Sequence, residues 1–356
     1  MEENLFVSKT APSIEFKSFW EAPSNIALVK YWGKISSQIP KNPSLSFTLS
    51  KCVTKTEILF KPQKSKTFDF DFYFGGKPMT DFEIKLGTFF KLVSSYIPWI
   101  NEYKLVIKSQ NSFPHSSGIA SSASAMAALS LNLMDMERKL FPKMDNSFFY
   151  QKASFLARLG SGSAARSIKG PVTIWGKNNA VSFSSDLYAV NFDDELSPIF
   201  KTYQNAILIV DKNTKSVTSS QGHNLMNKHP YASNRFIQAK SNLKNLVDIM
   251  KSEDLDGFVE IVESEALSLH AMMMTSNPYF ILFKPNTLSI IEKTWDLRKN
   301  KKIPICFTLD AGANVHLLYP FEFKNIVNIF IEDELKEFCQ NGEYILDYVG
   351  VGAKKI

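Results

Sequence analysis

The hydrophobic and polar positions in the first half of the chain follow two different periods. Stretches in which every second residue is apolar, or in which β-branched and aromatic residues dominate, predict strands. These stretches are Leu45 to Leu49, Thr54 to Phe60, Thr67 to Tyr73 and Tyr103 to Ile107. Apolar residues three and four positions apart predict helices over Phe82 to Ser95 and Ile119 to Leu133. The first half is therefore expected to mix strands and helices.

Helical spacing dominates the second half. After a buried-looking strand at Ala206 to Val210, the pattern predicts helices over Arg235 to Met250, Leu255 to Leu269 and Leu288 to Lys299, a strand over Ile303 to Leu309 and a helix near Glu332 to Cys339. The polar, proline-containing stretch Phe192 to Pro198 lies between the two patterns. We therefore expect two domains, comprising residues 1–196 and 197–356.

The composition is that of a folded protein, and its mild basicity fits anionic small molecules as partners. The 356 residues are 44% hydrophobic, which suffices for about two packed cores. A net charge of +6 without a dense basic block does not indicate a nucleic-acid or membrane partner. The three cysteines are far apart and odd in number, so they predict neither a disulfide framework nor a zinc site. We find no signal-peptide pattern and no apolar run of about 18 residues, and expect a soluble cytoplasmic protein.

The segment Asn111 to Ser124 is rich in serine and lies between a strand-like and a helix-like stretch. A turn of small residues lets backbone amides approach an oxyanion, and the start of the following helix adds unpaired N–H donors and partial positive charge. The alternative is a serine-rich cap on an ordinary helix. Because no Lys follows Gly118, the segment is not the common nucleotide loop Gly-x-x-x-x-Gly-Lys-Ser/Thr. It predicts a different kind of phosphate-binding loop.

Two further segments suit anionic groups. Lys30, Tyr31 and Lys34 crowd around one glycine, which fits a polyanion such as a diphosphate, although lysines on an ordinary strand are the alternative. Arg166 follows the small-residue turn Gly160 to Ala165, in a chain that uses only five arginines against 36 lysines. A guanidinium binds a carboxylate in bidentate fashion, so Arg166 is a candidate carboxylate clamp. A surface or helix-capping arginine is the alternative.

The remaining two segments follow predicted strands. Asp310 ends the apolar stretch Ile303 to Leu309, where a partly desolvated carboxylate can act as a base toward a hydroxyl. The alternative is an aspartate that caps its own turn. Lys215 to His223, which contains consecutive hydroxyl residues, resembles a phosphate-binding loop and equally a solvated Ser/Thr-rich loop.

Taken together and in this order, these segments resemble the diphosphomevalonate decarboxylases, within the kinase superfamily that also contains galactokinase, homoserine kinase, mevalonate kinase and phosphomevalonate kinase. The resemblance covers Ala22 to Asn314 and includes the stretch Asn42 to Ser46 besides the segments above. Only the serine loop is shared broadly by the superfamily. The resemblance implies an α+β, two-domain small-molecule kinase fold, with a ribosomal protein S5-like N-terminal domain, an α/β C-terminal domain and the active site in the cleft between them.

The resemblance also implies a reaction that requires ATP and Mg²⁺. The tertiary hydroxyl of mevalonate 5-diphosphate receives the γ-phosphoryl group, and loss of that phosphate and of CO₂ gives isopentenyl diphosphate. By the same matching, the catalytic residues would be Asp310, Lys30 and Arg166, and the substrate-binding residues would be Tyr31, Lys34, Ser163, Ser219 and Asn25. The ATP phosphates would be held by Ser116, Ser117, Gly118, Ala120, Ser121 and Ser122, with Ser122 as the metal ligand. A homodimer is a further expectation at the level of the family.

Three positions depart from the family pattern. Ser220 stands where many bacterial members carry Arg, Ala313 where Pro often follows Asp-Ala-Gly, and His115 where Thr or a small residue is more usual. The change at Ser220 keeps a mevalonate 5-phosphate decarboxylase open as an alternative. A mevalonate 3-kinase and a non-catalytic ligand-binding homologue are less favoured, because the catalytic candidates are all present.

Overall fold

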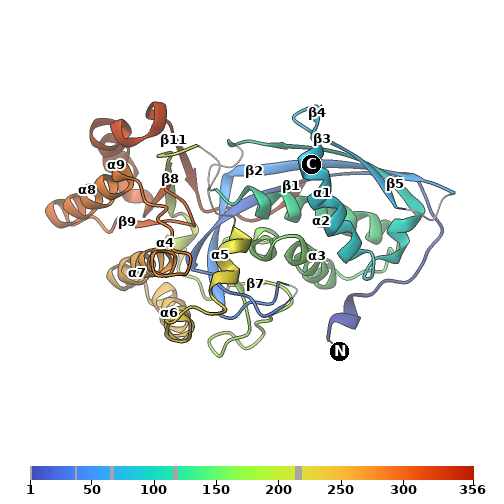
Figure 1. Cartoon of the computed structure of the whole chain (residues 1–356), viewed down its shortest axis with the longest axis horizontal. Coiled ribbons are helices and arrows are strands. Elements are labelled where there is room, and N and C mark those ends of the chain that lie inside the picture. The colour runs from blue at the N-terminus through green and yellow to red at the C-terminus, as the bar shows by residue number, and fades with distance from the viewer. Residues whose placement is uncertain (1, 37, 65–67, 115–118, 213–218) are drawn as a thin grey trace.

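The chain folds into two lobes, each built on its own β-sheet and covered by helices (Figure 1). The computed structural model describes residues 2–36, 38–64, 68–114, 119–212 and 219–356. The predicted α+β class is confirmed, because strands and helices are mixed in both lobes.

The sheet of the first lobe has the strand order β12-β1-β2-β5-β3-β4, with β6 pairing with β2 and with β7. Neighbouring strands are antiparallel except β3 and β5, which are parallel. The bounds are β1 (Phe16–Val29), β2 (Ser44–Pro62), β3 (Asp69–Phe74), β4 (Lys77–Pro78), β5 (Tyr103–Asn111), β6 (Val172–Trp175), β7 (Val190–Asn191) and β12 (Lys354–Lys355).

Three helices cover one face of this sheet: α1 (Thr80–Val93), α2 (Ser121–Leu140) and α3 (Asn146–Gly160). α2 packs against β1, β2 and α3, and its alanines allow the helix to approach the strands closely. α3 was not predicted, although Asp145 begins it as an N-cap that accepts hydrogen bonds from the N–H groups of Ser147 and Phe148.

The sheet of the second lobe has the order β11-β8-β10-β9, with every pair antiparallel. Helix α7 packs against β9 and against α6, and α8 also contacts β9. The bounds are β8 (Gln204–Leu208), β9 (Cys306–Thr308), β10 (Val315–Tyr319), β11 (Tyr344–Tyr348), α4 (Pro198–Lys201), α5 (Ser219–Leu225), α6 (Ala232–Ser252), α7 (Leu255–Met274), α8 (Pro285–Lys301) and α9 (Lys324–Phe330).

Two predicted segments have a different extent in the structure for an identifiable reason. The predicted strands at Leu45 and Thr54 form one strand, β2, because the Asp347 carboxylate on β11 accepts hydrogen bonds from the N–H groups of residues 50–52. The last predicted helix begins earlier, as α9, and then continues as a π-helical turn over Ile331–Leu335.

The two lobes share part of their hydrophobic core. Leu28 and Phe47 of the first lobe lie in one buried cluster with Tyr203 and Phe258 of the second. In addition, β12 at the C-terminus pairs with β1 in the first sheet. The shared core and the β1–β12 pair therefore fix the position of one lobe relative to the other, and with it the shape of the cavity between them.

Candidate active site

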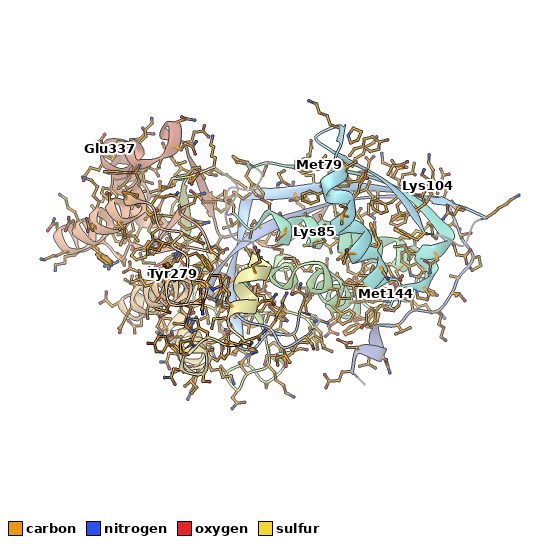
Figure 2. The ribbon with its side chains drawn as sticks, in the orientation of Figure 1. Met79, Lys85, Lys104, Met144, Tyr279 and Glu337 are labelled. Carbon is orange, nitrogen blue, oxygen red and sulfur yellow. The ribbon has the colours of Figure 1, made fainter. Side chains whose placement is uncertain are left out.

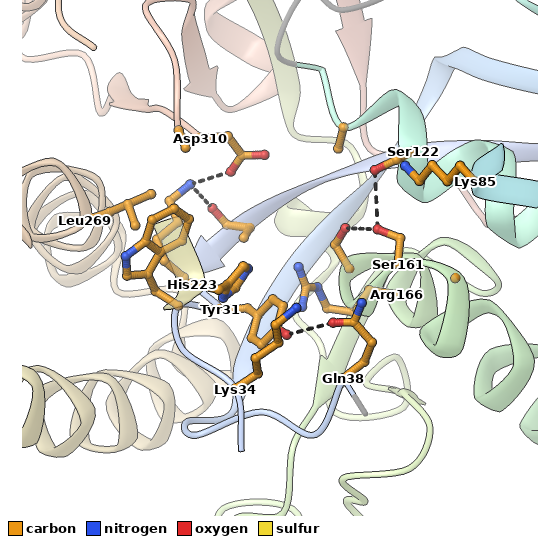
Figure 3. A pocket seen from close by; sticks show the side chains of 18 residues that line it. Tyr31, Lys34, Gln38, Lys85, Ser122, Ser161, Arg166, His223, Leu269 and Asp310 are labelled. Carbon is orange, nitrogen blue, oxygen red and sulfur yellow. Dashed lines mark hydrogen bonds and ion pairs between the residues drawn. The ribbon is translucent and has the colours of Figure 1, made fainter. Parts of the chain in front are cut away.

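A cavity of about 290 Å³ opens between the two lobes (Figure 3). The first lobe supplies the segment after β1, the start of α2, one residue of α1 and the 3₁₀ helix Gly162–Ser167. The second lobe supplies α5, α7 and the loop after β9. The polar and charged lining residues are Lys30, Tyr31, Lys34, Gln38, Lys85, Ser122, Ser161, Ser163, Arg166, His223 and Asp310.

Lys30 and Asp310 form an ion pair across the two lobes. Lys30 follows the last residue of β1, its side chain is 2% exposed, and its ammonium lies 3.3 Å from Asp310 Oδ1. The ammonium also donates to the carbonyl of Ala27 at 2.5 Å. Burial lowers the pKa of Lys30, while the charges of Asp310 and Glu265 oppose this effect. His270 donates to the backbone carbonyl of Asp310 at 3.1 Å, which holds the loop after β9 in place.

Arg166 is a buried cation whose side-chain hydrogen bonds, among the described residues, go to hydroxyl groups, and its guanidinium also lies over the Trp175 ring. Its Nε donates to Ser46 Oγ and its Nη1 to Ser44 Oγ, each at 2.5 Å, and the residue is 2% exposed. Within the described ranges, no carboxylate lies within ion-pair distance of the guanidinium. Burial lowers the pKa of Arg166 to about 10, so the side chain is still charged at neutral pH. A buried cation without an anionic partner, on a cavity wall, is an anion-binding group.

A row of serines crosses the cavity wall. Ser122 Oγ lies 3.3 Å from Ser161 Oγ, which lies 3.4 Å from Ser163 Oγ (Figure 3). At one end of the row α2 begins, and its N-cap residue, Ala120, makes no side-chain capping hydrogen bond. Ala120, which precedes it, has a left-handed backbone with φ of 46°. The N–H groups at the start of α2 that have no partner within the helix, together with the hydroxyls, are donors suited to phosphate oxygens.

Tyr31 and Lys34 lie along the other side of the cavity. Tyr31 Oη donates to Gln38 Oε1 at 3.4 Å, and its ring packs 4.7 Å from that of Trp175. Burial raises the pKa of Tyr31, so its phenol remains a hydrogen-bond donor. Gly162 permits this position, because a Cβ there would lie 2.8 Å from the Tyr31 ring.

The comparisons with known proteins cover both lobes. Residues 22–189 match the diphosphomevalonate decarboxylase-like N-terminal domain, and residues 205–346 match the mevalonate 5-diphosphate decarboxylase C-terminal domain. The chain belongs to the diphosphomevalonate decarboxylase family. It is 30% identical over 322 residues to the diphosphomevalonate decarboxylase of Debaryomyces hansenii, which covers 85% of this chain and 79% of that protein.

Solved structures of the family have the same architecture. The mevalonate diphosphate decarboxylase of Staphylococcus aureus aligns with a TM-score of 0.82 at 26% identity, over 96% of this chain and 98% of that one. A structure described as MDDEF in complex with MVAPP, AMPPCP and magnesium aligns with a TM-score of 0.81 at 27% identity, over 96% and 99%. These matches confirm the predicted two-domain fold.

Most of the described residues that the family resemblance singled out line this cavity. They are Lys30, Tyr31, Lys34, Ala120, Ser122, Ser163, Arg166 and Asp310. Asn25 does not: its amide donates to the Ser163 carbonyl and to Ser167 Oγ, so it supports the serine row from behind. Ser121 borders a separate, smaller cavity between α1 and α2. Ser116, Ser117 and Gly118 lie outside the described residues, as do His115 and the side chain of Ser219.

Several residues in or beside the site were not predicted from the sequence, and three of them carry charge or a titratable ring: Lys85, His223 and Glu265. Lys85 reaches from α1 toward Ser122, and His223 lies beside Tyr31 (Figure 3). Glu265 lies behind the cavity, where its carboxylate accepts a hydrogen bond from the backbone N–H of Lys30 at 2.8 Å. For His223, the position at the end of the hydroxyl-rich segment was the available signal. Lys85 and Glu265 lie on ordinary amphipathic helices and carry no such signal.

The donor set suits a nucleotide phosphate more than a metal held by the protein alone. Among the residues the structure describes, no group of three or more His, Cys, Asp or Glu side chains could hold a metal ion. Mg²⁺ bound through ATP phosphates needs few protein ligands, and the Ser122 hydroxyl beside the start of α2 fits that arrangement. None of the helices in the described ranges is long and apolar enough to span a bilayer.

Proposed function

We propose that this chain catalyses the ATP-dependent decarboxylation of mevalonate 5-diphosphate to isopentenyl diphosphate, a step of the mevalonate pathway of isoprenoid biosynthesis. ATP and mevalonate 5-diphosphate give isopentenyl diphosphate, ADP, phosphate and CO₂. The observation that carries the proposal is Arg166, a buried guanidinium on the wall of the cavity that has no anionic partner among the described residues. A substrate carboxylate would supply the anionic partner for this guanidinium.

Arg166 binds the substrate carboxylate and holds it in the orientation from which CO₂ leaves. Its Nε and Nη1 atoms are already engaged by Ser46 and Ser44, so the plane of the guanidinium is set before substrate binds. Asp310, which lies across the cavity, accepts the proton of the tertiary hydroxyl. Lys30 holds the Asp310 carboxylate and stabilises the negative charge that develops on the hydroxyl oxygen.

The diphosphate of the substrate binds at the side of the cavity formed by Tyr31, Lys34 and Ser163. An ammonium, a protonated phenol and a serine hydroxyl are complementary to phosphate oxygens. Asn25 keeps Ser163 in position through the Ser163 carbonyl. Ser219, at the start of α5, is the remaining member of this predicted set.

ATP phosphates bind at the start of α2, held by Ala120, Ser121 and Ser122 together with the serine loop that precedes them. The family binds an ATP analogue and magnesium in the structure described as MDDEF with AMPPCP. Ser122 and the nucleotide phosphates would hold Mg²⁺, which would supply positive charge near the transferring phosphoryl group. The chain's own task there is to orient the phosphates through N–H and hydroxyl donors.

Three further expectations from the sequence analysis are part of the proposal. The chain divides into functional domains at residues 1–196 and 197–356, it acts in the cytoplasm, and it forms a homodimer. Its partner is the small-molecule substrate, with neither a nucleic acid nor a membrane involved.

The test is ATP turnover with CO₂ release by the purified chain, comparing mevalonate 5-diphosphate, mevalonate 5-phosphate and mevalonate. We expect CO₂ and isopentenyl diphosphate from the diphosphate with much the highest kcat/KM. A preference for the monophosphate would make the chain a mevalonate 5-phosphate decarboxylase. ATP consumption without CO₂ would make it a kinase, and no turnover of any substrate would support a ligand-binding homologue.

A further inference from the structure

Helix α5 of the second lobe packs directly on the segment that follows β1 in the first lobe, which contains Tyr31 and Trp32. A Cβ at Gly222 would lie 2.5 Å from the Trp32 indole, so only glycine allows this approach. The next residue, His223, places its ring 4.2 Å from that of Tyr31 and 4.8 Å from that of Trp32, measured between centroids. The imidazole is thereby held against two aromatic rings on the cavity wall (Figure 3).

One nitrogen of this imidazole accepts a hydrogen bond from the backbone. The N–H of Gly33 donates to His223 Nδ1 at 2.9 Å. A nitrogen that accepts a hydrogen bond carries no hydrogen, so the hydrogen of the neutral ring is on Nε2. The structure therefore defines the tautomer of His223, which presents a donor at the atom opposite the Gly33 contact.

The environment keeps the ring neutral. Burial, followed by the charges of Lys34 and Arg166, lowers the pKa of His223 to about 3. The residue is 8% exposed, and no hydrogen-bond partner for Nε2 occurs in the part of the chain that the structure describes. A donor on a cavity wall that no described protein group engages has an energetic reason to bind a ligand acceptor.

We propose that His223 is a substrate-binding residue whose neutral Nε2–H donates to a diphosphate oxygen of the substrate. The residues that share its side of the cavity, Tyr31 and Lys34, are those assigned above to the diphosphate. The inference rests on the proposed function for the identity of the ligand. His223 adds a directed hydrogen bond there without adding another positive charge to a region that already holds Lys34 and Arg166.

Two substitutions separate ligand binding from structural support. In H223N, the amide oxygen reaches the position of Nδ1 and keeps an acceptor for Gly33, but the donor at Nε2 is lost. In H223Q, the amide nitrogen reaches the position of Nε2 and keeps the donor, but the acceptor for Gly33 is lost. The two variants therefore remove opposite halves of the interaction.

We expect H223N to raise KM for mevalonate 5-diphosphate about tenfold or more, as for loss of a hydrogen bond to a charged group, with a smaller effect in H223Q. KM for ATP is expected to change little in either variant. Calorimetric titration with inorganic diphosphate should show the same order of affinity, with wild type and H223Q binding more tightly than H223N. Thermal unfolding of each variant establishes that it is folded.

The opposite order, with H223Q impaired and H223N unaffected, would overturn the inference and leave His223 as a support for Gly33. Equal substrate KM and equal diphosphate affinity in both variants and wild type would also overturn it. Failure of the proposed function is recognised separately, because wild type would then release no CO₂ from mevalonate 5-diphosphate. The calorimetric comparison of the variants with diphosphate would still decide whether His223 binds phosphate oxygens.

Discussion

At one end of the cavity the side chain of Lys30 and the whole of Arg166 are each 2% exposed, whereas at the other end Ser122 is half-buried and Lys85 is exposed. We refer to Lys30 and Arg166, with the half-buried Asp310 that pairs with Lys30, as the buried end, and to Ala120, Ser122 and Lys85 as the open end. Figure 2 shows Lys85 on α1, on the side of the first lobe that faces the second. At the buried end, the charges of Lys30 and Asp310 compensate each other, and we propose that a bound ligand compensates the charge of Arg166.

The difference predicts different consequences of mutation. A charge removed from water depends on its few partners, so changing one group at the buried end alters the protonation or orientation of the others. At the open end water replaces a lost contact, and exposed charges contribute little each. Substitutions at the buried end should therefore reduce the rate of the chemical step, and substitutions at the open end should weaken binding of ATP.

The largest effect is expected for D310N. It removes the proton acceptor and the charge that faces Lys30 while keeping the shape of the side chain. We expect kcat to fall about 10²–10⁴-fold, with a modest change in KM, as for loss of a general base. Steady-state kinetics with thermal unfolding as a fold control provide the measurement. Full activity of D310N would remove Asp310 from the mechanism.

R166K tests whether the buried end needs a planar clamp or only a positive charge. Lysine keeps the charge but cannot bind Ser44, Ser46 and a carboxylate together in a fixed plane. We expect CO₂ release to fall about 10–100-fold, by the loss of bidentate orientation. R158K provides the control, because Arg158 is also buried but does not line the cavity. Equal losses in both variants would indicate a general effect on folding.

E265Q tests the charge behind Lys30. Glu265 is fully buried, accepts the Lys30 N–H, and pairs with Arg235. Its charge raises the pKa of Lys30 against the effect of burial. Because the proposed role needs protonated Lys30, activity falls as pH rises through this pKa, and without the Glu265 charge the fall should occur at lower pH. The alkaline limb of kcat against pH is the measurement.

Breaking the buried Arg235 pair also costs stability, about 3 kcal/mol or more, so the E265Q variant needs a matched control. E263Q is on the same helix and removes a carboxylate that binds Arg298 and Trp295 rather than Lys30. It should lower the free energy of unfolding while leaving the alkaline limb unchanged. A shift of the limb in both variants would contradict a specific effect on Lys30.

The smallest effect is expected for K85M at the open end. Loss of an exposed charge near the nucleotide phosphates should raise KM for ATP about two- to fivefold, with KM for mevalonate 5-diphosphate unchanged. The effect should decrease at high salt, because exposed charges are screened. K91M, on the same helix and outside the cavity, serves as the control. A loss of kcat in K85M comparable to that of D310N would abolish the distinction between the two ends.

Local patterns predicted the elements whose stability is local. The helices α6, α7 and α8 occur where apolar residues repeat at helical spacing, within a few residues of the predicted bounds. The motif residues Lys30, Arg166 and Asp310 were identified by their chemical type within small-residue or strand-end contexts, and the structure places all three on one cavity. Their roles remain predictions until the variants above are measured.

The sequence by itself determined the α+β composition, the helices and the family-specific residues, because these depend on side chains within a few positions of one another. Only the tertiary structure decided the contacts between distant segments. Asp347 makes β2 continuous, Glu265 binds the backbone of Lys30, and His223 accepts from Gly33, each across 190 residues or more. No local period encodes such pairs. They arise because packing the two lobes on a shared core buries polar groups, and each buried group requires a partner.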